Sequence, residues 1–154
     1  MTRRGAVSGR LAKSDYETLA EFRYLLRRFI AFSDAAAEGA GLRPQQHQAL
    51  LVIKGFPGRE RITIGELAER LGIRHHSAVG LVDRLAARNL VRRCIDPADR
   101  RQVEIALTPK AEAVLTRLSL AHRDELTRLA PLFQGLFTQL RAPQSRPHRG
   151  SEKA

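Results

Sequence analysis

The sequence predicts a mostly helical domain of the α+β class, with one β-hairpin in its second half. Apolar residues recur at helical spacing through much of residues 14–88 and again from 109 to 140. Residues 103–107 instead alternate with a period of two, which is the pattern of a half-buried strand. The 154 residues are about the length of one domain, so these elements are expected to share one core.

The charge balance favours a polyanionic partner. Lys and Arg number 27 against 16 Asp and Glu, which gives a net charge of +11. Most of the basic residues are arginine, the side chain that forks onto phosphate. A solvated basic surface is the alternative interpretation of the same charge.

Other composition features exclude several classes of protein. The single cysteine, Cys94, excludes an internal disulfide framework and a Cys-rich zinc site. No apolar run reaches the ~18 residues of a membrane span, and the N-terminus lacks the apolar core of a secretory signal. These features indicate a soluble intracellular protein.

The chain is expected to begin with a loose, basic arm over residues 1–13, which has no apolar period. Ser14 and Glu17 then have the spacing of a capping box and predict the start of the first helix. This helix carries apolar residues on two faces, so it is expected to pack between two layers. Its apolar residues include Leu19, Phe22, Tyr24, Leu25, Leu26, Phe29 and Ile30.

Glycines at 39 and 41 end this helix, and Pro44 opens a second helix that runs to Lys54. Thr63 and Glu66 form another capping box, which predicts a short helix ending before Gly72 as left-handed cap. The inward residues of these two helices are expected to be Leu50, Leu51, Ile53, Leu67, Ala68 and Leu71.

A further helix is predicted from His75 to Arg88, with Asn89 at a position that favours left-handed backbone. A hairpin follows, with strands over 90–95 and 103–107 around the turn Asp96-Pro97-Ala98-Asp99. The inward residues of the helix are expected to be Ala78, Leu81, Val82 and Leu85.

Thr108 and Pro109 have the chemistry of an N-cap and first residue, so a long helix is expected to begin there. Pro131 is expected to interrupt it, leaving residues 132–140 as a last short apolar helix. Residues 141–154 are almost free of apolar residues and predict a disordered tail. The inward residues of the long helix are expected to be Val114, Leu115, Leu118, Ala121 and Leu129.

The two helices joined by the tight turn at Gly72 have the form of a helix-turn-helix, and the basic hairpin directly after them has the form of a wing. A helix of this kind fits the major groove of duplex DNA, and wing arginines fit phosphates or the minor groove. Gly80 would let the backbone approach the bases, and Val79 could touch a thymine methyl group. The candidate DNA-binding residues are His75, His76, Ser77, Val79, Gly80, Arg84, Arg100 and Arg101.

From Leu42 to about Leu126 the chain resembles the MarR family of winged helix-turn-helix transcriptional regulators. The stretches that carry the resemblance are ITIGELAERLGIRHHSAVGLVDRLAARNLVRR, DPADRRQVEIALTPKA and HRDEL. The resemblance implies a ligand-responsive repressor that binds a pseudo-palindromic operator as a homodimer and lies in the cytoplasm with the nucleoid. It implies one domain over 14–140, in which 42–108 form the winged helix and 14–41 with 109–140 form the dimerisation layer.

The sequence departs from this family at three positions. Arg43 stands where the family usually has a capping Thr, so the cap of the second helix is expected to be weaker. Asn89 replaces a usual Gly. Gly80 lies where some members carry a base-reading side chain, which indicates less direct readout there.

Several residues keep two interpretations. Arg101 resembles the family's minor-groove arginine, and the alternative is a solvated charge. Arg100 either contacts DNA or pairs with Asp99 or Asp96, and Arg84 either holds a phosphate or pairs with Asp83 or a wing residue.

A small aromatic or phenolic effector is the partner suggested for Tyr16, Phe22, Tyr24 and His47, which would line a pocket beneath the dimer layer; ordinary core packing is the alternative. Cys94 is interpreted as a packed strand cysteine, with redox sensing as the alternative.

No cofactor, metal or catalytic activity is expected. His75 and His76 are adjacent in a helix, so their side chains point about 100° apart and cannot chelate one ion well. The chain has no phosphate loop and no nucleophile-elbow motif. The alternative to a DNA-binding regulator is a winged-helix module that binds a ligand or protein and contacts DNA only weakly.

Overall fold

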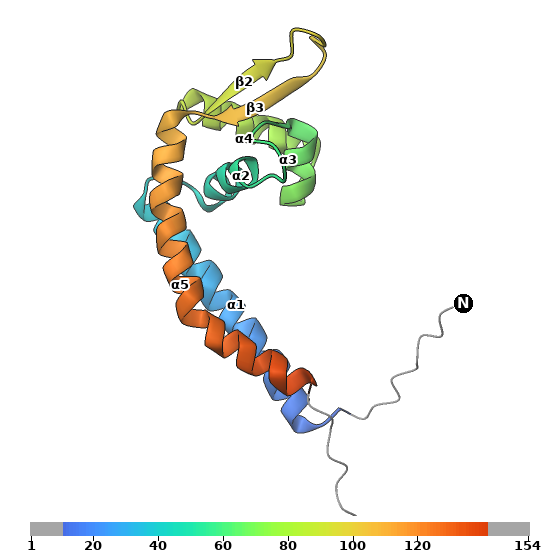
Figure 1. Cartoon of the computed structure of the whole chain (residues 1–154), viewed down its shortest axis with the longest axis vertical. Coiled ribbons are helices and arrows are strands. Elements are labelled where there is room, and N and C mark those ends of the chain that lie inside the picture. Colours follow the sequence, from blue (N-terminus) through green and yellow to red (C-terminus); the bar gives the residue numbers. More distant parts are fainter. Residues whose placement is uncertain (1–10, 142–154) are drawn as a thin grey trace, which may run out of the picture.

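The computed structural model describes residues 11–141, and this part of the chain folds as a small winged domain on a stalk of two long helices (Figure 1). The mostly helical class with one hairpin is confirmed. The predicted arm and tail fall almost entirely on residues 1–10 and 142–154, which lie outside the described residues. The elements are α1 (Lys13–Gly39), α2 (Pro44–Lys54), β1 (Ile62–Thr63), α3 (Ile64–Leu71), α4 (His75–Ala87), β2 (Val91–Ile95), β3 (Val103–Leu107) and α5 (Pro109–Arg141).

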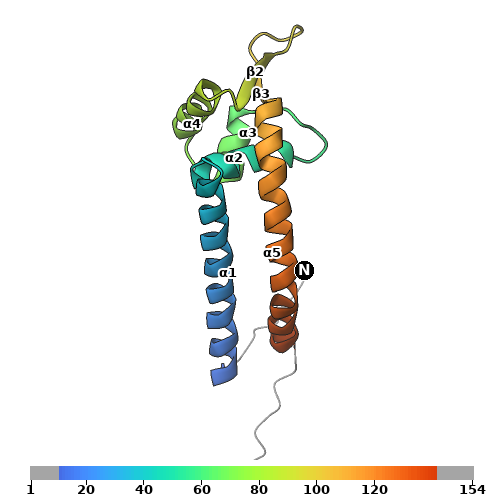
Figure 2. The ribbon, with the colours of Figure 1, turned by 90° about the vertical axis from the view of Figure 1, so that its left-hand side faces the viewer.

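The stalk consists of α1 and α5, which run antiparallel and side by side (Figure 2). Leu25, Leu129 and Leu136 are buried between them. Phe22 packs edge-on against Phe133, with ring centroids 5.8 Å apart. These contacts use only one face of each helix, and the remaining faces of the stalk stay exposed.

The start of α1 differs from the prediction. The helix begins at Lys13 with Ala12 as N-cap, because the Asp15 carboxylate reaches back to accept the Ala12 backbone N–H at 2.8 Å. The capping box predicted at Ser14 and Glu17 is therefore wrong. Both residues lie inside the first turns of the helix.

The predicted break at Pro131 is also wrong, because α5 is one helix from Pro109 to Arg141. A proline inside a helix removes one backbone hydrogen bond and crowds the preceding turn. Burial of Leu129 and Leu136 against α1 on either side of the proline favours one continuous helical path. Figure 1 shows that α5 bends along its length.

The core of the winged domain lies between α2, α3, α4 and the sheet. The sheet has the order β1-β3-β2 and is antiparallel, with Ile62 opposite Ile105 and Val91 opposite Leu107. The two-residue strand β1 was not predicted, since it is too short to show a period. The largest fully buried side chains here are Leu50, Ile53, Ile62, Leu67, Leu81, Val82, Leu85 and Ile105.

Two predicted core residues are exposed. Leu51 is 48% exposed on α2, and Ala121 points outward on α5. The place expected for Ala121 is taken by its neighbour His122, which is buried on the inner face of α5. Ala106 is buried as well as Ile105 and Leu107, so the base of β3 is covered on both faces.

Within residues 11–141, no helix combines the length and the apolar content that crossing a membrane would need.

Candidate nucleic-acid interface

The helix-turn-helix is held by the caps that the sequence predicts. Thr63 Oγ1 accepts the Glu66 N–H at 3.2 Å, and the Glu66 carboxylate accepts the Thr63 N–H at 2.8 Å. That second hydrogen bond, assisted by the Arg59 guanidinium, lowers the pKa of Glu66. Gly72 has φ +64°, and the Ile73 N–H donates to the Ala68 carbonyl at 3.0 Å. The capping box and the glycine cap are confirmed.

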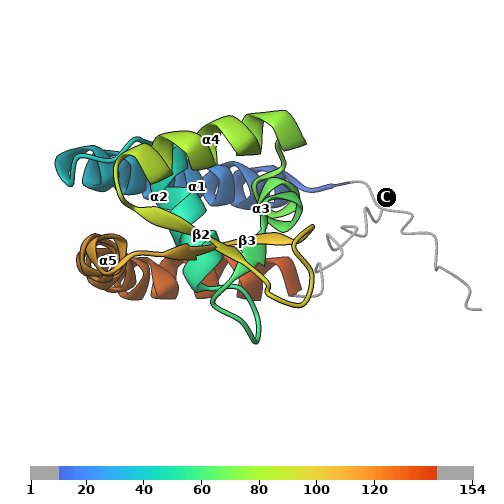
Figure 3. The same ribbon diagram turned by 90° about the horizontal axis from the view of Figure 1, so that it is seen from above.

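Helix α4 divides into a buried and an outward face. Ala78, Leu81, Val82 and Leu85 are buried, as predicted. On the outward face, His75, His76 and Ser77 are exposed, and Val79 and Gly80 are half-buried. In Figure 3 α4 and the hairpin lie at one end of the molecule, in front of the two long helices. This end therefore presents a helix and a hairpin to the same side.

Gly80 also makes room for the side chain of Arg84. A Cβ at this position would lie 3.3 Å from Arg84 Nη1. The Arg84 guanidinium thus lies along the helix over Gly80, one turn nearer the N-terminus. Because glycine has no side chain, this position leaves space for the Arg84 guanidinium as well as for a ligand.

One interpretation of Arg84 was an ion pair with Asp83. In the structure, Asp83 pairs with a different arginine. The Asp83 carboxylate pairs with Arg93 of β2. Arg93 therefore ties the wing to α4. On the other side of the wing, Arg59 pairs with both Glu66 of α3 and Glu104 of β3.

The wing tip is organised by its two aspartates. Asp96 accepts the Ala98 N–H at 2.8 Å, and Asp99 accepts the Arg101 N–H at 3.0 Å. Both carboxylates thus shape the turn through the backbone. Arg100 and Arg101 are exposed, and neither belongs to an ion pair among the described residues. Two arginines at the tip are therefore available to an anionic partner.

The N-terminal end of α4 adds a residue that the sequence analysis missed. Arg74, the N-cap of α4, is exposed next to His75 and His76. The first backbone N–H groups of a helix lack partners within it and favour anions. Its position directly before the predicted helix is the sequence signal that could have identified Arg74 as a candidate.

Cys94 is half-buried in β2, opposite Glu104. Its Sγ accepts a hydrogen bond from Arg92 Nη1 at 3.1 Å. The Arg92 side chain therefore lies along β2. Cys94 lies in a strand that pairs with β3, as predicted.

The four residues predicted to line one effector pocket lie apart. Tyr16 and Tyr24 are 57% and 49% exposed on faces of α1 that point away from α5. Phe22 packs in the stalk between Phe133 and Phe137. Of the four, only His47 borders a cavity between α2 and α5. The reason is the helical period, which places Tyr16 and Tyr24 on sides of α1 different from that of Leu25.

His47 lies in a buried cluster where α1, α2 and α5 meet. Its ring centroid is 4.8 Å from that of His122. His122 contacts Ser33 Oγ through Nε2 at 2.8 Å and the Leu118 carbonyl through Nδ1. Burial, and then the neighbouring His122, lower the pKa of His47, while Asp34 opposes the shift.

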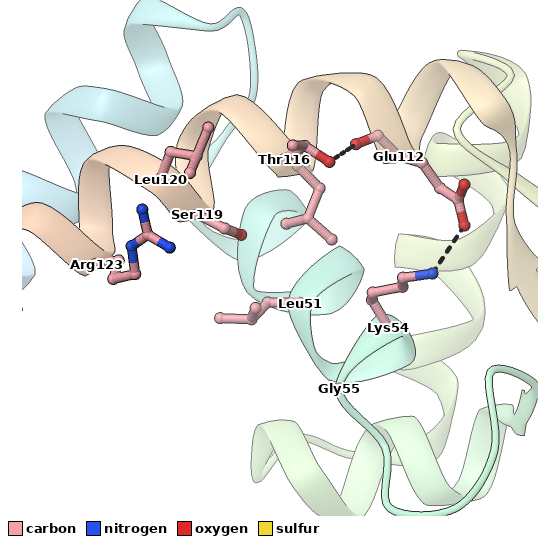
Figure 4. A pocket seen from close by; sticks show the side chains of 9 residues that line it. Leu51, Lys54, Gly55, Glu112, Thr116, Ser119, Leu120 and Arg123 are labelled. Carbon is pink, nitrogen blue, oxygen red and sulfur yellow. Dashed lines mark hydrogen bonds and ion pairs between the residues drawn. The ribbon is translucent and has the colours of Figure 1, made fainter.

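Two adjoining cavities run along α5 beside this cluster. The first, of about 480 Å³, is bordered by His47, His122 and Phe29. The second, of about 400 Å³, has the Lys54–Glu112 pair at one end and Arg123 at the other (Figure 4). Residues common to both are Leu51, Ser119 and Arg123. Within the described residues, no group of three or more His, Cys, Asp or Glu side chains is placed to hold a metal ion.

Comparisons with known proteins agree with this geometry. A model described as the MarR family matches residues 40–102. Over 101 residues the chain is 36% identical to YcgE of Bacillus subtilis, an uncharacterized HTH-type transcriptional regulator, which is 64% of each chain. Over 67 residues it is 37% identical to YsmB, another such protein of B. subtilis, which is 44% of this chain and 45% of YsmB. The matches thus span less than two thirds of either curated relative.

A solved structure extends the likeness to the long helices. A point mutant of S. aureus MepR, bound to an oligodeoxyribonucleotide, superposes with a TM-score of 0.63 at 17% identity. The match covers 81% of this chain and 94% of that one, and it therefore includes the stalk as well as the winged helix. The segment over residues 40–102 therefore matches the MarR family, and the described residues share the fold of this solved structure.

Proposed function

We propose that this protein is a transcriptional regulator that binds double-stranded DNA in a sequence-specific way as a homodimer. The observation that carries the proposal is the joint exposure of the outward face of α4 and the wing-tip arginines on one end of the molecule. The S. aureus MepR mutant that shares this fold is bound to an oligodeoxyribonucleotide in its solved structure, which supports the proposal. A regulator of this kind works where the chromosome lies, so we place it in the cytoplasm with the nucleoid.

The two exposed elements suit different parts of the duplex. Helix α4 fits the major groove, where His75, His76 and Val79 would meet base edges and Ser77 and Arg84 would meet the backbone. Arg100 and Arg101 extend from the wing and suit phosphates or the negative potential of a narrow minor groove. Base choice is therefore assigned to α4 and most of the nonspecific affinity to the wing.

The homodimer is supported by apolar side chains along the stalk. They lie on both long helices, in the half of the stalk that is farther from the winged domain. Exposed apolar side chains that gather on one part of a protein often mark a protein–protein interface. The residues are Tyr16, Leu19, Leu26 and Ile30 on α1, and Leu132, Phe137 and Leu140 on α5.

The repressor role and the response to a ligand are part of the same proposal. The cavities beside His47 and Arg123 lie between α2 and α5, and the one beside His47 is also bordered by Phe29 of α1. A small aromatic or phenolic effector held there would favour one angle between the stalk and the winged domain. If that angle misplaces α4 for the operator, DNA is released and transcription resumes.

The test is selection of duplexes from a random-sequence library by the purified protein. We expect enrichment of a pseudo-palindrome with half-sites about 10–10.5 base pairs apart, bound by two chains. Changing both His75 and His76 to Ala should alter which bases are enriched, at about 1–3 kcal/mol per misread pair. Weak binding without enrichment would contradict the proposal and favour a winged-helix module that serves a ligand or protein partner.

A further inference from the structure

The C-terminal end of α4 is fastened to the turn between α1 and α2. Arg88, the C-cap of α4, donates from Nη1 to Gln46 Oε1 at 2.9 Å and from Nη2 to the Gly41 carbonyl at 2.8 Å. The two acceptors lie more than 40 residues before it in the chain. One planar guanidinium thus holds two points of the stalk-to-domain junction.

Both acceptors are themselves fixed. Gln46 is only 5% exposed, and the same Oε1 atom accepts the backbone N–H of Arg43, the N-cap residue of α2, at 3.0 Å. Gly41 has φ +77°, and the following Leu42 N–H donates to the Ala37 carbonyl at the end of α1. The dipole of α1 also favours a cation such as the Arg88 guanidinium near the C-terminal end of that helix.

The backbone of Arg88 is held from the other long helix. Lys110 in the first turn of α5 donates to the Arg88 carbonyl at 3.0 Å. The end of α4 therefore contacts the end of α1 through its side chain and the start of α5 through its main chain. Asn89, with φ +55°, then turns the chain into the wing.

This attachment lies at the opposite end of α4 from the proposed base-reading residues. The 13 residues of α4 make a lever about 20 Å long. Because α4 is packed into the core, it would move with the winged domain, and a rotation of that domain by about 10° about Arg88 would move the His75 end by about 3.4 Å, which is one base-pair step. A small rotation at the attachment would thus displace the His75 end by as much as one base pair changes the spacing between half-sites.

We propose that Arg88 is a positioning residue that sets the separation of the two recognition helices, and so the spacing of the half-sites that the dimer accepts. The inference rests on the proposed function, because it needs a dimer that binds DNA. It assigns no DNA contact to Arg88 itself.

The experiment uses a duplex selected from a random library by the full-length protein, together with versions whose half-sites are moved by one or two base pairs. Wild-type protein is expected to lose about tenfold in affinity for a one-base-pair change, as for a misread pair. Arg88→Ala should reduce this loss to about threefold or less, while binding to an isolated half-site stays within about twofold of wild type. Arg88→Lys keeps the charge but not the fork, so it should fall between the two.

Arg117→Ala is the matched control, because it removes an exposed arginine from α5 and should leave the spacing preference unchanged. A second measurement needs no DNA: spin labels placed through His76→Cys in a Cys94→Ser background report the distance between the two α4 helices of the dimer. Arg88→Ala should broaden that distance distribution.

The proposal is overturned if Arg88→Ala keeps the wild-type spacing preference and a sharp distance distribution. Equal losses on half-sites and full sites would also overturn it, because they would assign Arg88 to DNA contact. If wild-type protein selects no two-part site, the proposed function itself has failed, and that result is distinct from a failure of the variant alone.

Discussion

Arg101 provides the clearest perturbation of the wing. Its side chain is exposed at the tip, while its backbone N–H is fixed by Asp99 at 3.0 Å. Arg101→Ala therefore removes one positive charge without removing a hydrogen bond that shapes the turn. An exposed substitution of this kind changes the free energy of unfolding by less than about 0.5 kcal/mol.

The expected loss follows from the release of counterions. If Arg101 neutralises one phosphate, the slope of log affinity against log salt should flatten by about 0.9. Between 50 and 200 mM salt the ratio of wild-type to variant affinity should then shrink by about 3.5-fold. The loss should be similar on selected and random duplexes, because the minor groove distinguishes little beyond A·T from G·C.

Fluorescence anisotropy with labelled duplexes at four or more salt concentrations measures this slope. Arg117→Ala on α5 is the matched control and should keep the wild-type slope. Wild-type affinity and an unchanged slope for Arg101→Ala would refute the assignment of the wing tip to phosphate or minor-groove contact. A loss confined to the selected duplex would instead show that Arg101 reads bases.

Three further predictions concern stability and assembly. The lowered pKa of His47 favours the neutral ring in the folded state. The contribution of His47 to the free energy of unfolding should therefore be complete above about pH 6.5 and be lost as the pH drops below it. His47→Gln should flatten this trend in thermal melts between pH 5 and 8. Ile30→Glu places a charge on the exposed stripe of α1 and should yield monomers in sedimentation, whereas an unchanged dimer would move the interface elsewhere. Asn89→Ala should cost about 1–2 kcal/mol because φ is +55°, and Asn89→Gly should not; equal melting temperatures for both variants would contradict this explanation.

Local signals predicted the winged domain well because each one has a nearly unique structural solution. Thr63 with Glu66, the glycine at 72 and the asparagine at 89 each mark one end of a helix, and all three adopt the expected geometry. The inward face of α4 follows from its period alone. Strong periodicity and strong caps together therefore predict the order of elements from Thr63 to Thr108.

The errors lie where distant contacts decide the outcome. The start of α1 moved because Asp15 competes with Ser14 for the same role, and sequence spacing allows both. Pro131 stays inside a helix because packing against α1 outweighs a local cost. A strand of two residues and the exposure of Leu51 depend on partners far along the chain.

The candidate site shows the same division. The exposed face of α4 and the free wing-tip arginines follow from helical period and turn chemistry. The pairing of Arg93 with Asp83, and the grip of Arg88 on Gln46, required the three-dimensional structure. Both are ion or hydrogen-bond contacts between separate elements, and no spacing rule encodes them.

The central claim is sequence-specific DNA binding by the α4 face and the wing. It is tested most directly by the ratio of affinities for a selected duplex and for a random duplex of equal length at physiological salt. A specific regulator should show a ratio of about 10³ or more. A ratio near one, with binding to both duplexes falling equally as salt rises, would contradict the claim and leave only a basic surface that attracts nucleic acid.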